Sequence, residues 1–131
     1  MSLFDFQDSV IVSRCWTGEI CRYDCKPAGR PALIARIRRR FNPIFVCPEV
    51  LGGLPVPRPA APLHRKHGQI IHDITGRNCS IEFIAGAQKT LEIALAHNCK
   101  IAYLVRGSPS CDARGFTGEL LLAHGIRIIN Y

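Results

Sequence analysis

The chain has 131 residues, a length that suits one domain and allows a hydrophobic core to be buried without disulfides. Hydrophobic residues make up 47% of the chain, which argues against intrinsic disorder. The formal net charge of +7 weakly favours an anionic partner or substrate.

The pattern of apolar and turn-forming residues predicts alternating strands and helices. In chain order we expect a strand over residues 8–15, a turn region over 16–30, a helix over 31–41, a strand over 44–46, an irregular loop over 50–62, a short edge strand over 69–74, a helix over 80–97, a strand over 100–105, a helix over 117–124 and a strand over 126–129. Such alternation indicates a parallel sheet with helices on its faces. We therefore predict an α/β fold: a small Rossmann-like three-layer domain over residues 1–131, with a mainly parallel sheet of about four strands.

Local signals support the two longer helices. Pro31 suits the first turn of one helix, and Asn42–Pro43 is expected to end it. Ser80 is a candidate N-cap of the other. The face that we expect this second helix to bury consists of Phe83, Ala87, Leu91 and Leu95, which recur every four residues.

The cysteines are the first candidates for chemistry. They are Cys15, Cys21, Cys25, Cys47, Cys79, Cys99 and Cys111. An odd number in a chain without a visible secretion signal argues against a disulfide framework. Cysteines on turns then point to metal or thiol chemistry, whereas single cysteines in helices or strands are more often small buried hydrophobic residues. We assign Cys79 and Cys99 to the second group.

Three of the cysteines follow three predicted strands. Cys15 ends the first strand, Cys47 ends the second, and Cys111 lies just past the third. In open α/β sheets, ligands bind beyond the carboxyl ends of the strands, so the fold would bring these thiols to one edge. On spacing alone, three unrelated buried thiols are about equally plausible, because no compact Cys-x-x-Cys motif is present.

The segments around these cysteines carry a resemblance to a known family. They read Cys-Trp-Thr-Gly at 15–18, Cys-Pro-Glu-Val-Leu-Gly-Gly-Leu-Pro at 47–55 and Ser-Pro-Ser-Cys at 108–111. From about Val10 to the C-terminus, the chain resembles an iron–sulfur family that includes thiouracil desulfidases. The block that begins at residue 47 is the most distinctive of the three.

The resemblance implies a [4Fe–4S] cluster held by Cys15, Cys47 and Cys111, with one iron left open to a soft substrate sulfur. The implied enzyme cleaves a C–S bond with a hydrolytic outcome. It removes sulfur from a small thiolated pyrimidine such as thiouracil and leaves the oxo form and sulfide without net redox change. Glu49 matches the family's glutamate and is the expected acid/base, and Ser108 matches a serine near the substrate.

Further residues near these motifs have expected roles. Ser110 would hydrogen-bond a cluster sulfur, which tunes such clusters. Asp112 stands where the family has glycine. Cys21 and Cys25 are additional to the three implied ligands, and ordinary turn cysteines are their simpler interpretation. Arg58 is expected to bind either loop carbonyls or an anionic group.

Two alternatives stay open, neither with hydrolytic activity. The first is a basic, metal-containing module that docks nucleic acid through Arg36–Arg40, although the chain lacks the interleaved aromatic residues of a single-strand platform. His64 and His67 could complete a zinc site with cysteines, but two histidines in a proline-rich loop are more often exposed. The second is a sulfur carrier with a persulfide on Cys21 or Cys25.

The start of the chain indicates a cytoplasmic protein. Met1–Asp8 carries Asp5 and Asp8 where a secretion signal has basic residues, and the apolar run Val10–Val12 is too short for a signal core. No segment approaches the length of a membrane span, so we expect no membrane partner.

Overall fold

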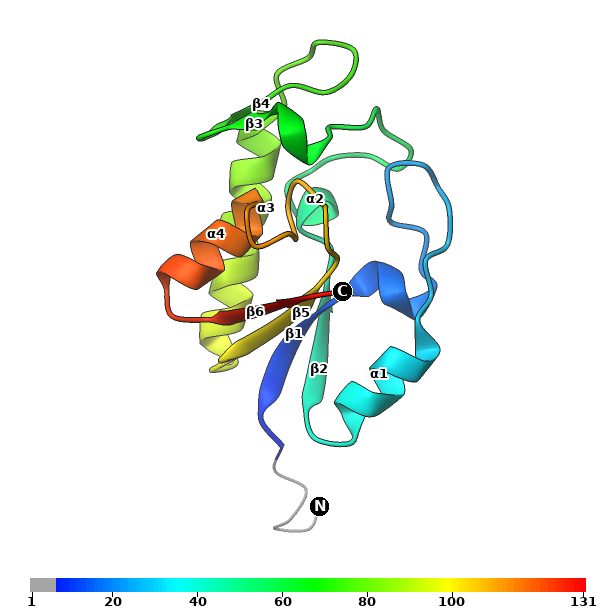
Figure 1. Cartoon of the computed structure of the whole chain (residues 1–131), viewed down its shortest axis with the longest axis vertical. Helices are drawn as coiled ribbons and strands as arrows, with labels where there is room; N and C mark the ends of the chain where they lie inside the picture. The colour runs from blue at the N-terminus through cyan, green and yellow to red at the C-terminus, as the bar shows by residue number, and fades with distance from the viewer. Residues whose placement is uncertain (1–6) are drawn as a thin grey trace.

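A four-stranded parallel sheet lies at the centre of the computed structural model, which describes residues 7–131 (Figure 1). Its strands are β1 (Ser9–Ser13), β2 (Asn42–Val46), β5 (Ile101–Leu104) and β6 (Arg127–Asn130), in the order β2–β1–β5–β6. Each neighbouring pair is parallel, so the predicted α/β fold is confirmed. Most of Met1–Asp8, the segment used to predict that no secretion signal is present, lies outside the described residues.

Helices cover both faces of this sheet and form the predicted three layers (Figure 1). They are α1 (Pro31–Arg38), α2 (Pro48–Leu51), α3 (Ser80–Ala96) and α4 (Phe116–Ala123). The α1 layer packs on Val10 and Val12 of β1, whereas α3 and α4 pack on Ile11 from the other side. Because β1 lies between two layers, all three side chains are at most 1% exposed. Among the described helices, none has the length and apolar character needed to cross a membrane.

Short elements complete the described chain beyond the carboxyl edge of the sheet. They are two single turns of 3₁₀ helix, η2 (Arg14–Thr17) and η3 (Leu63–Arg65), and the antiparallel strands β3 (Lys66–His67) and β4 (Ile70–Ile71). The expected edge strand over 69–74 is therefore only β4. It pairs with β3 because the proline-rich loop carries this segment away from the main sheet (Figure 1).

Several element boundaries differ from the predicted ones by one to three residues, and three differences bear on the site or its neighbouring helix. Cys15 lies in η2 rather than at the end of the first strand, because β1 stops at Ser13. The helix expected to reach residue 41 ends at Arg38, since Asn42 already belongs to β2. Pro48 suits a first helical turn and starts α2, so the loop predicted to be irregular begins with helix.

The buried face of α3 shows the limit of a four-residue repeat. Phe83 and Ala87 are buried as expected, and Leu91 is partly buried. Leu95 is 54% exposed, so that prediction is wrong. At 3.6 residues per turn, each step of four residues rotates the side chain by roughly 40°, and three steps carry Leu95 off the buried face. Ala94 is buried instead.

Two glycines allow α2 and α3 to cross closely. A Cβ on Gly86 would overlap the carbonyl oxygen of Pro48, and a Cβ on Gly52 would overlap that of Glu82. The backbones therefore meet where side chains would keep them apart. This crossing fixes the turn that follows Cys47 against a long helix.

Gly86→Ala is expected to destabilise the protein by about 1–3 kcal/mol, because the added methyl group forces packed backbone apart. Helix propensity acts in the opposite direction, since alanine is favoured over glycine by about 1 kcal/mol in a helix interior. Urea denaturation followed by circular dichroism measures the free energy of unfolding. Gln88→Ala, at an exposed α3 position, is the matched control and should be near neutral. A Gly86→Ala protein as stable as the wild type would contradict the close crossing.

Candidate functional site

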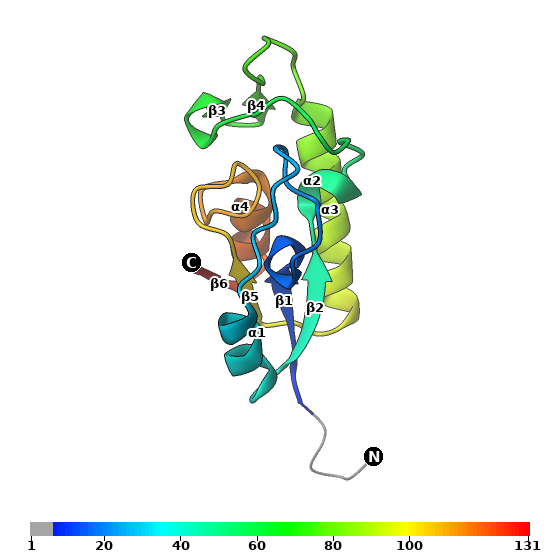
Figure 2. The same ribbon diagram turned by 90° about the vertical axis from the view of Figure 1, so that its right-hand side faces the viewer.

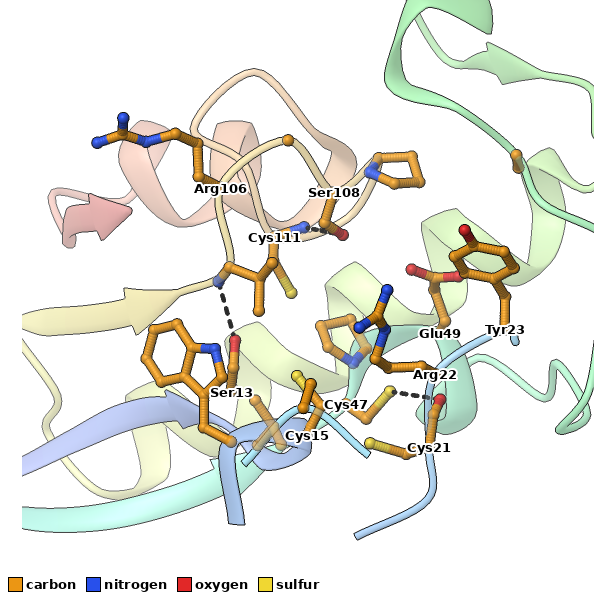
Figure 3. Close-up of a pocket in the computed structure, with 18 of the residues that line it drawn as sticks. Ser13, Cys15, Cys21, Arg22, Tyr23, Cys47, Glu49, Arg106, Ser108 and Cys111 are labelled. Carbon is orange, nitrogen blue, oxygen red and sulfur yellow. Dashed lines mark hydrogen bonds between the residues drawn. The ribbon is translucent and has the colours of Figure 1, made fainter. Parts of the chain in front are cut away.

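A pocket of about 500 Å³ lies at the carboxyl edge of the main sheet, where β1, β2 and β5 end (Figure 3). Turns after these strands and the proline-rich loop build its wall. The chemistry-bearing residues in the lining are Cys15, Cys21, Cys47, Glu49, Ser108 and Cys111. Of the residues singled out as the site in the sequence, only Ser110 is not part of this lining.

Each of the three predicted cysteine ligands lies in the segment that follows its own strand. Cys15 is in η2 after β1, Cys47 is the N-cap of α2 directly after β2, and Cys111 is in the loop after β5. The rigid backbone of a strand stands behind each segment. In Figure 3 the three labelled side chains lie around one pocket, although they are up to 96 positions apart in the chain.

Burial dominates the electrostatics of these thiols. It raises the pKa of Cys15 and of Cys47 to about 11, and it also raises the pKa of Cys111. Negative charge adds to this effect, because Glu49, Cys47 and Cys15 act on Cys111. Three thiolates in this pocket are therefore unfavourable without a compensating positive charge, which a metal centre would supply.

Three thiols in one pocket are a donor set of the kind that iron–sulfur clusters use. Zinc holds its thiolates at about 2.3 Å, so their sulfurs must converge on one point. In the described range, no three His, Cys, Asp or Glu side chains are arranged to hold one ion. Thiolates that bind different irons of one cluster stand farther apart. His64 and His67 are exposed, as expected, and do not line the pocket.

The other cysteines have distinct surroundings. Cys21 is buried and lines the pocket, and the Cys47 thiol donates a hydrogen bond to its carbonyl oxygen at 3.8 Å. Cys25 is exposed and is not part of the lining. Cys79 and Cys99 are buried in apolar clusters, in agreement with their assignment as hydrophobic core residues.

Glu49 is held by a shielded ion pair. The Arg58 Nε donates to Glu49 Oε1 at 3.1 Å, and the two side chains are 5% and 16% exposed. The same guanidinium donates to the carbonyl oxygens of Pro55 and Cys21, each at 3.1 Å. Arg58 thus binds both kinds of group that the sequence suggested. No other hydrogen bond to the Glu49 carboxylate is found in residues 7–131, so its second oxygen is available at the pocket.

Ser108 and Ser110 differ although they are two residues apart. The Ser108 Oγ accepts hydrogen bonds from the backbone N–H groups of Ser110 and Cys111, at 3.2 and 3.1 Å. Its hydroxyl proton is therefore free to be donated into the pocket that it lines. Ser110 is 1% exposed, and its hydroxyl has no hydrogen-bond partner within the described chain.

Asp112 and Asn130 hold the loop that carries Cys111. The Asp112 Oδ2 accepts from the Gly107 N–H at 2.7 Å, and Oδ1 accepts from the Arg114 Nε at 2.9 Å. These bonds, with Arg114 as the main contributor, lower the pKa of Asp112 to about 2. The Asn130 Nδ2 donates to the Cys111 carbonyl at 3.0 Å and ties the loop to β6.

Ser13 is a pocket residue that sequence reasoning missed. It ends β1, is 2% exposed, and its Oγ accepts from the Val105 N–H at 3.0 Å. A hydrogen bond with Ser13 lowers the pKa of the Cys111 thiol, against the larger effect of burial. The sequence did contain a signal for Ser13: it directly follows an apolar run, so its hydroxyl could be expected to be buried. A buried hydroxyl needs a hydrogen-bond partner, which marks the position as one with a specific contact. Trp16 and Tyr131, also in the lining, carried no comparable signal.

Comparisons with known proteins cover nearly the whole chain. A model of the family described as 2-thiouracil desulfurase matches residues 10–130. "Uncharacterized protein YbbK" of Bacillus subtilis (strain 168) is 29% identical over 146 aligned residues, covering 92% of this chain and 94% of that protein. A solved structure named "[4Fe-4S]-dependent thiouracil desulfidase TudS" is 31% identical, with a TM-score of 0.86 over 95% of this chain and 91% of that chain.

Asp112→Asn is expected to lower the free energy of unfolding at pH 7 by about 2 kcal/mol, which corresponds to a carboxyl pKa of about 2 rather than 3.8. The ionised carboxylate stabilises the fold above its unfolded pKa, and this contribution is lost as the pH falls towards 2. The difference between wild type and variant should therefore shrink between pH 6 and pH 3 in urea denaturation. A difference that is equal at both pH values would exclude the charged clamp.

Proposed function

Because this chain belongs to the 2-thiouracil desulfurase family, we propose that it replaces the sulfur of a small thiolated pyrimidine, such as thiouracil, with oxygen from water. The products are the oxo pyrimidine and sulfide, and no electrons are gained or lost. In this proposal, residues 1–131 form one desulfidase domain that acts in the cytoplasm on a free small molecule.

The observation that carries the proposal is the meeting of three thiols, a carboxylate and a hydroxyl around one pocket. Cys15, Cys47 and Cys111 arrive from three strand ends, and Glu49 and Ser108 line the same pocket. Removal of sulfur without redox change needs soft ligands for iron together with groups that move protons. This combination is the one that the pocket offers.

We assign Cys15, Cys47 and Cys111 as ligands of a [4Fe–4S] cluster. The name of the solved relative as a [4Fe-4S]-dependent enzyme supports this assignment. When bound, a cluster with three thiolate ligands supplies one iron with an open position for a soft sulfur atom. The protein's own part is to hold three thiols in fixed segments and to shield them from water.

Glu49 is the proposed acid/base. Arg58 holds one carboxylate oxygen at 3.1 Å, which leaves the other oxygen in a defined position at the pocket. From there it can take a proton from the water that attacks the ring carbon and return it to the departing sulfur. The shielded ion pair keeps the carboxylate from turning away from the pocket.

Ser108 is the proposed donor to the substrate ring. Two backbone N–H groups occupy its oxygen, so its proton can be given to a ring heteroatom. The expected hydrogen bond from Ser110 to a cluster sulfur stays a prediction, and it would require that hydroxyl to turn towards the pocket.

Anaerobic reconstitution with iron and sulfide tests the cofactor and the reaction together. We expect near-equal iron and sulfide contents, a broad brown absorbance, and release of sulfide from 2-thiouracil by the loaded protein. Cys15→Ser, Cys47→Ser and Cys111→Ser should each lose the absorbance and the activity. Cys25→Ser, outside the pocket, is the matched control and should keep both.

Zinc binding alone, or cysteine variants that behave like the wild type, would overturn the enzyme assignment. A basic binding domain would then be the better account. A loaded cluster without sulfide release from thiolated pyrimidines would retain the cofactor assignment but reject the substrate class.

Glu49→Gln is expected to lower turnover by about 10²-fold or more, because a positioned acid/base contributes that much, while the iron and sulfide contents stay unchanged. Steady-state sulfide release, normalised to iron, measures this effect. Glu92→Gln, at an exposed position of α3, removes the same charge away from the pocket and should have no effect. Full turnover in Glu49→Gln would remove Glu49 from the mechanism.

A further inference from the structure

β6 lies at one edge of the main sheet, beside β5 (Figure 2). The apolar cluster beneath α1 draws on β1, β2 and β5 but contains no residue of β6. Ile128 packs with the opposite layer, so strand alternation directs Arg127, Ile129 and Tyr131 to the α1 side. Arg127 is exposed, Ile129 is partly exposed, and Tyr131 is 40% exposed.

Aromatic rings from separate parts of the chain form a continuous row on this side. Tyr131 stacks on Tyr103, with ring centroids 6.5 Å apart and planes inclined by 22°. Tyr103 also contacts Phe41 at 6.2 Å, and Tyr131 meets the edge of Trp16 at 6.2 Å. The sequence shows no interleaved aromatic residues because the fold alone brings these positions together.

Basic side chains accompany the aromatic row. The Arg30 guanidinium lies over both Trp16 and Tyr131, at 5.6 and 5.5 Å from the ring centroids. Other exposed basic residues of the α1 layer and the neighbouring strand ends are Arg36, Arg38, Arg39, Arg40, Lys100, Arg106 and Arg127. Within the described residues, the six ion pairs involve other basic groups and none of these. Of the 17 Lys and Arg residues, six form these ion pairs, and eight of the remaining eleven are Arg30 and the seven residues just named.

We propose that the aromatic–arginine face, defined as Phe41, Tyr103 and Tyr131 with Arg30 and Arg127, binds single-stranded nucleic acid. Tyr131 is the exposed ring of this face, whereas Phe41 and Tyr103 are partly buried against the apolar cluster beneath α1 and support it from behind. Bases stack on exposed aromatic rings with little sequence preference, and arginines contact both bases and phosphates. A duplex keeps its bases stacked on each other, so it can use only the phosphate contacts. Charge complementarity thus favours a nucleic acid, and the rings favour a single strand.

The position of this face relates it to the pocket. Arg30 and Tyr131 of this face also line the pocket, so the face and the pocket are adjacent. A single-stranded nucleic acid bound along the face would have one end next to the pocket. The binding itself requires neither a cluster nor turnover, and it stands or falls separately from the proposed desulfuration.

Fluorescence anisotropy with a labelled oligouridylate of about ten nucleotides tests the face on the full chain. Matched probes are an oligothymidylate and a duplex of the same length. We expect saturable binding of both single strands and weaker binding of the duplex. Tyr131→Ala should weaken single-strand binding at least about fivefold, as the loss of one stacked base requires. Arg127→Gln should reduce the slope of log affinity against log salt by about 0.7.

Two controls separate a defined face from diffuse attraction. Leu122→Ala removes another exposed apolar side chain, on α4 in the opposite layer, and Lys89→Gln removes another exposed charge, on α3. Both should leave binding unchanged. The proposal is overturned if the wild type shows no saturable binding, if the duplex binds as tightly as the single strands, or if each control weakens binding as much as its partner variant.

Discussion

The parallel pairing of β1 with both β2 and β5 is the constraint on which the site depends. Ser13 pairs with Val46, so η2 and the start of α2 leave the sheet side by side. Val12 pairs with Tyr103, which brings the loop after β5 to the same edge. A shift of one residue in either pairing would turn the strand ends to the opposite face and separate the thiols. Sheet register, rather than a compact Cys-x-x-Cys motif, therefore brings the three thiols to one pocket.

The electrostatics of the pocket follow from what this arrangement buries. Arg22 lowers the pKa of Cys15 and Arg58 lowers that of Cys47, but burial outweighs both and the thiols stay protonated at neutral pH. Arg58 is already engaged by Glu49 and cannot neutralise three thiolates as well. The protein thus supplies soft donors without enough positive charge of its own to hold them as thiolates, so the charge that offsets three thiolates would have to come from a bound metal centre.

Local sequence signals predicted the main sheet and its helices because they report periodicity and turn chemistry within short windows. They failed where distant contacts decide. Leu95 continues a four-residue repeat but lies off the buried face of α3. The segment that forms β4 pairs with β3 instead of the main sheet, because the proline-rich loop carries it away from that sheet. Strand order together with family motifs predicted that Cys15, Cys47 and Cys111 meet; all three line one pocket, and their role as ligands stays a prediction. Ser13 was missed because its partner, Val105, is 92 residues away.

The exposed face of β6 has a geometric origin in the same small fold. Four strands at about 4.8 Å spacing span roughly 19 Å, whereas one helix is about 10 Å wide. α3 and α4 together cover one side of the sheet, but α1 is the one helix that the described chain places on the other. A strand at the edge is then left open, and this chain fills that position with tyrosine and arginine rather than with short polar residues. Since Tyr131 belongs to this opening and also lines the pocket, a surface that a single helix cannot cover becomes continuous with the pocket.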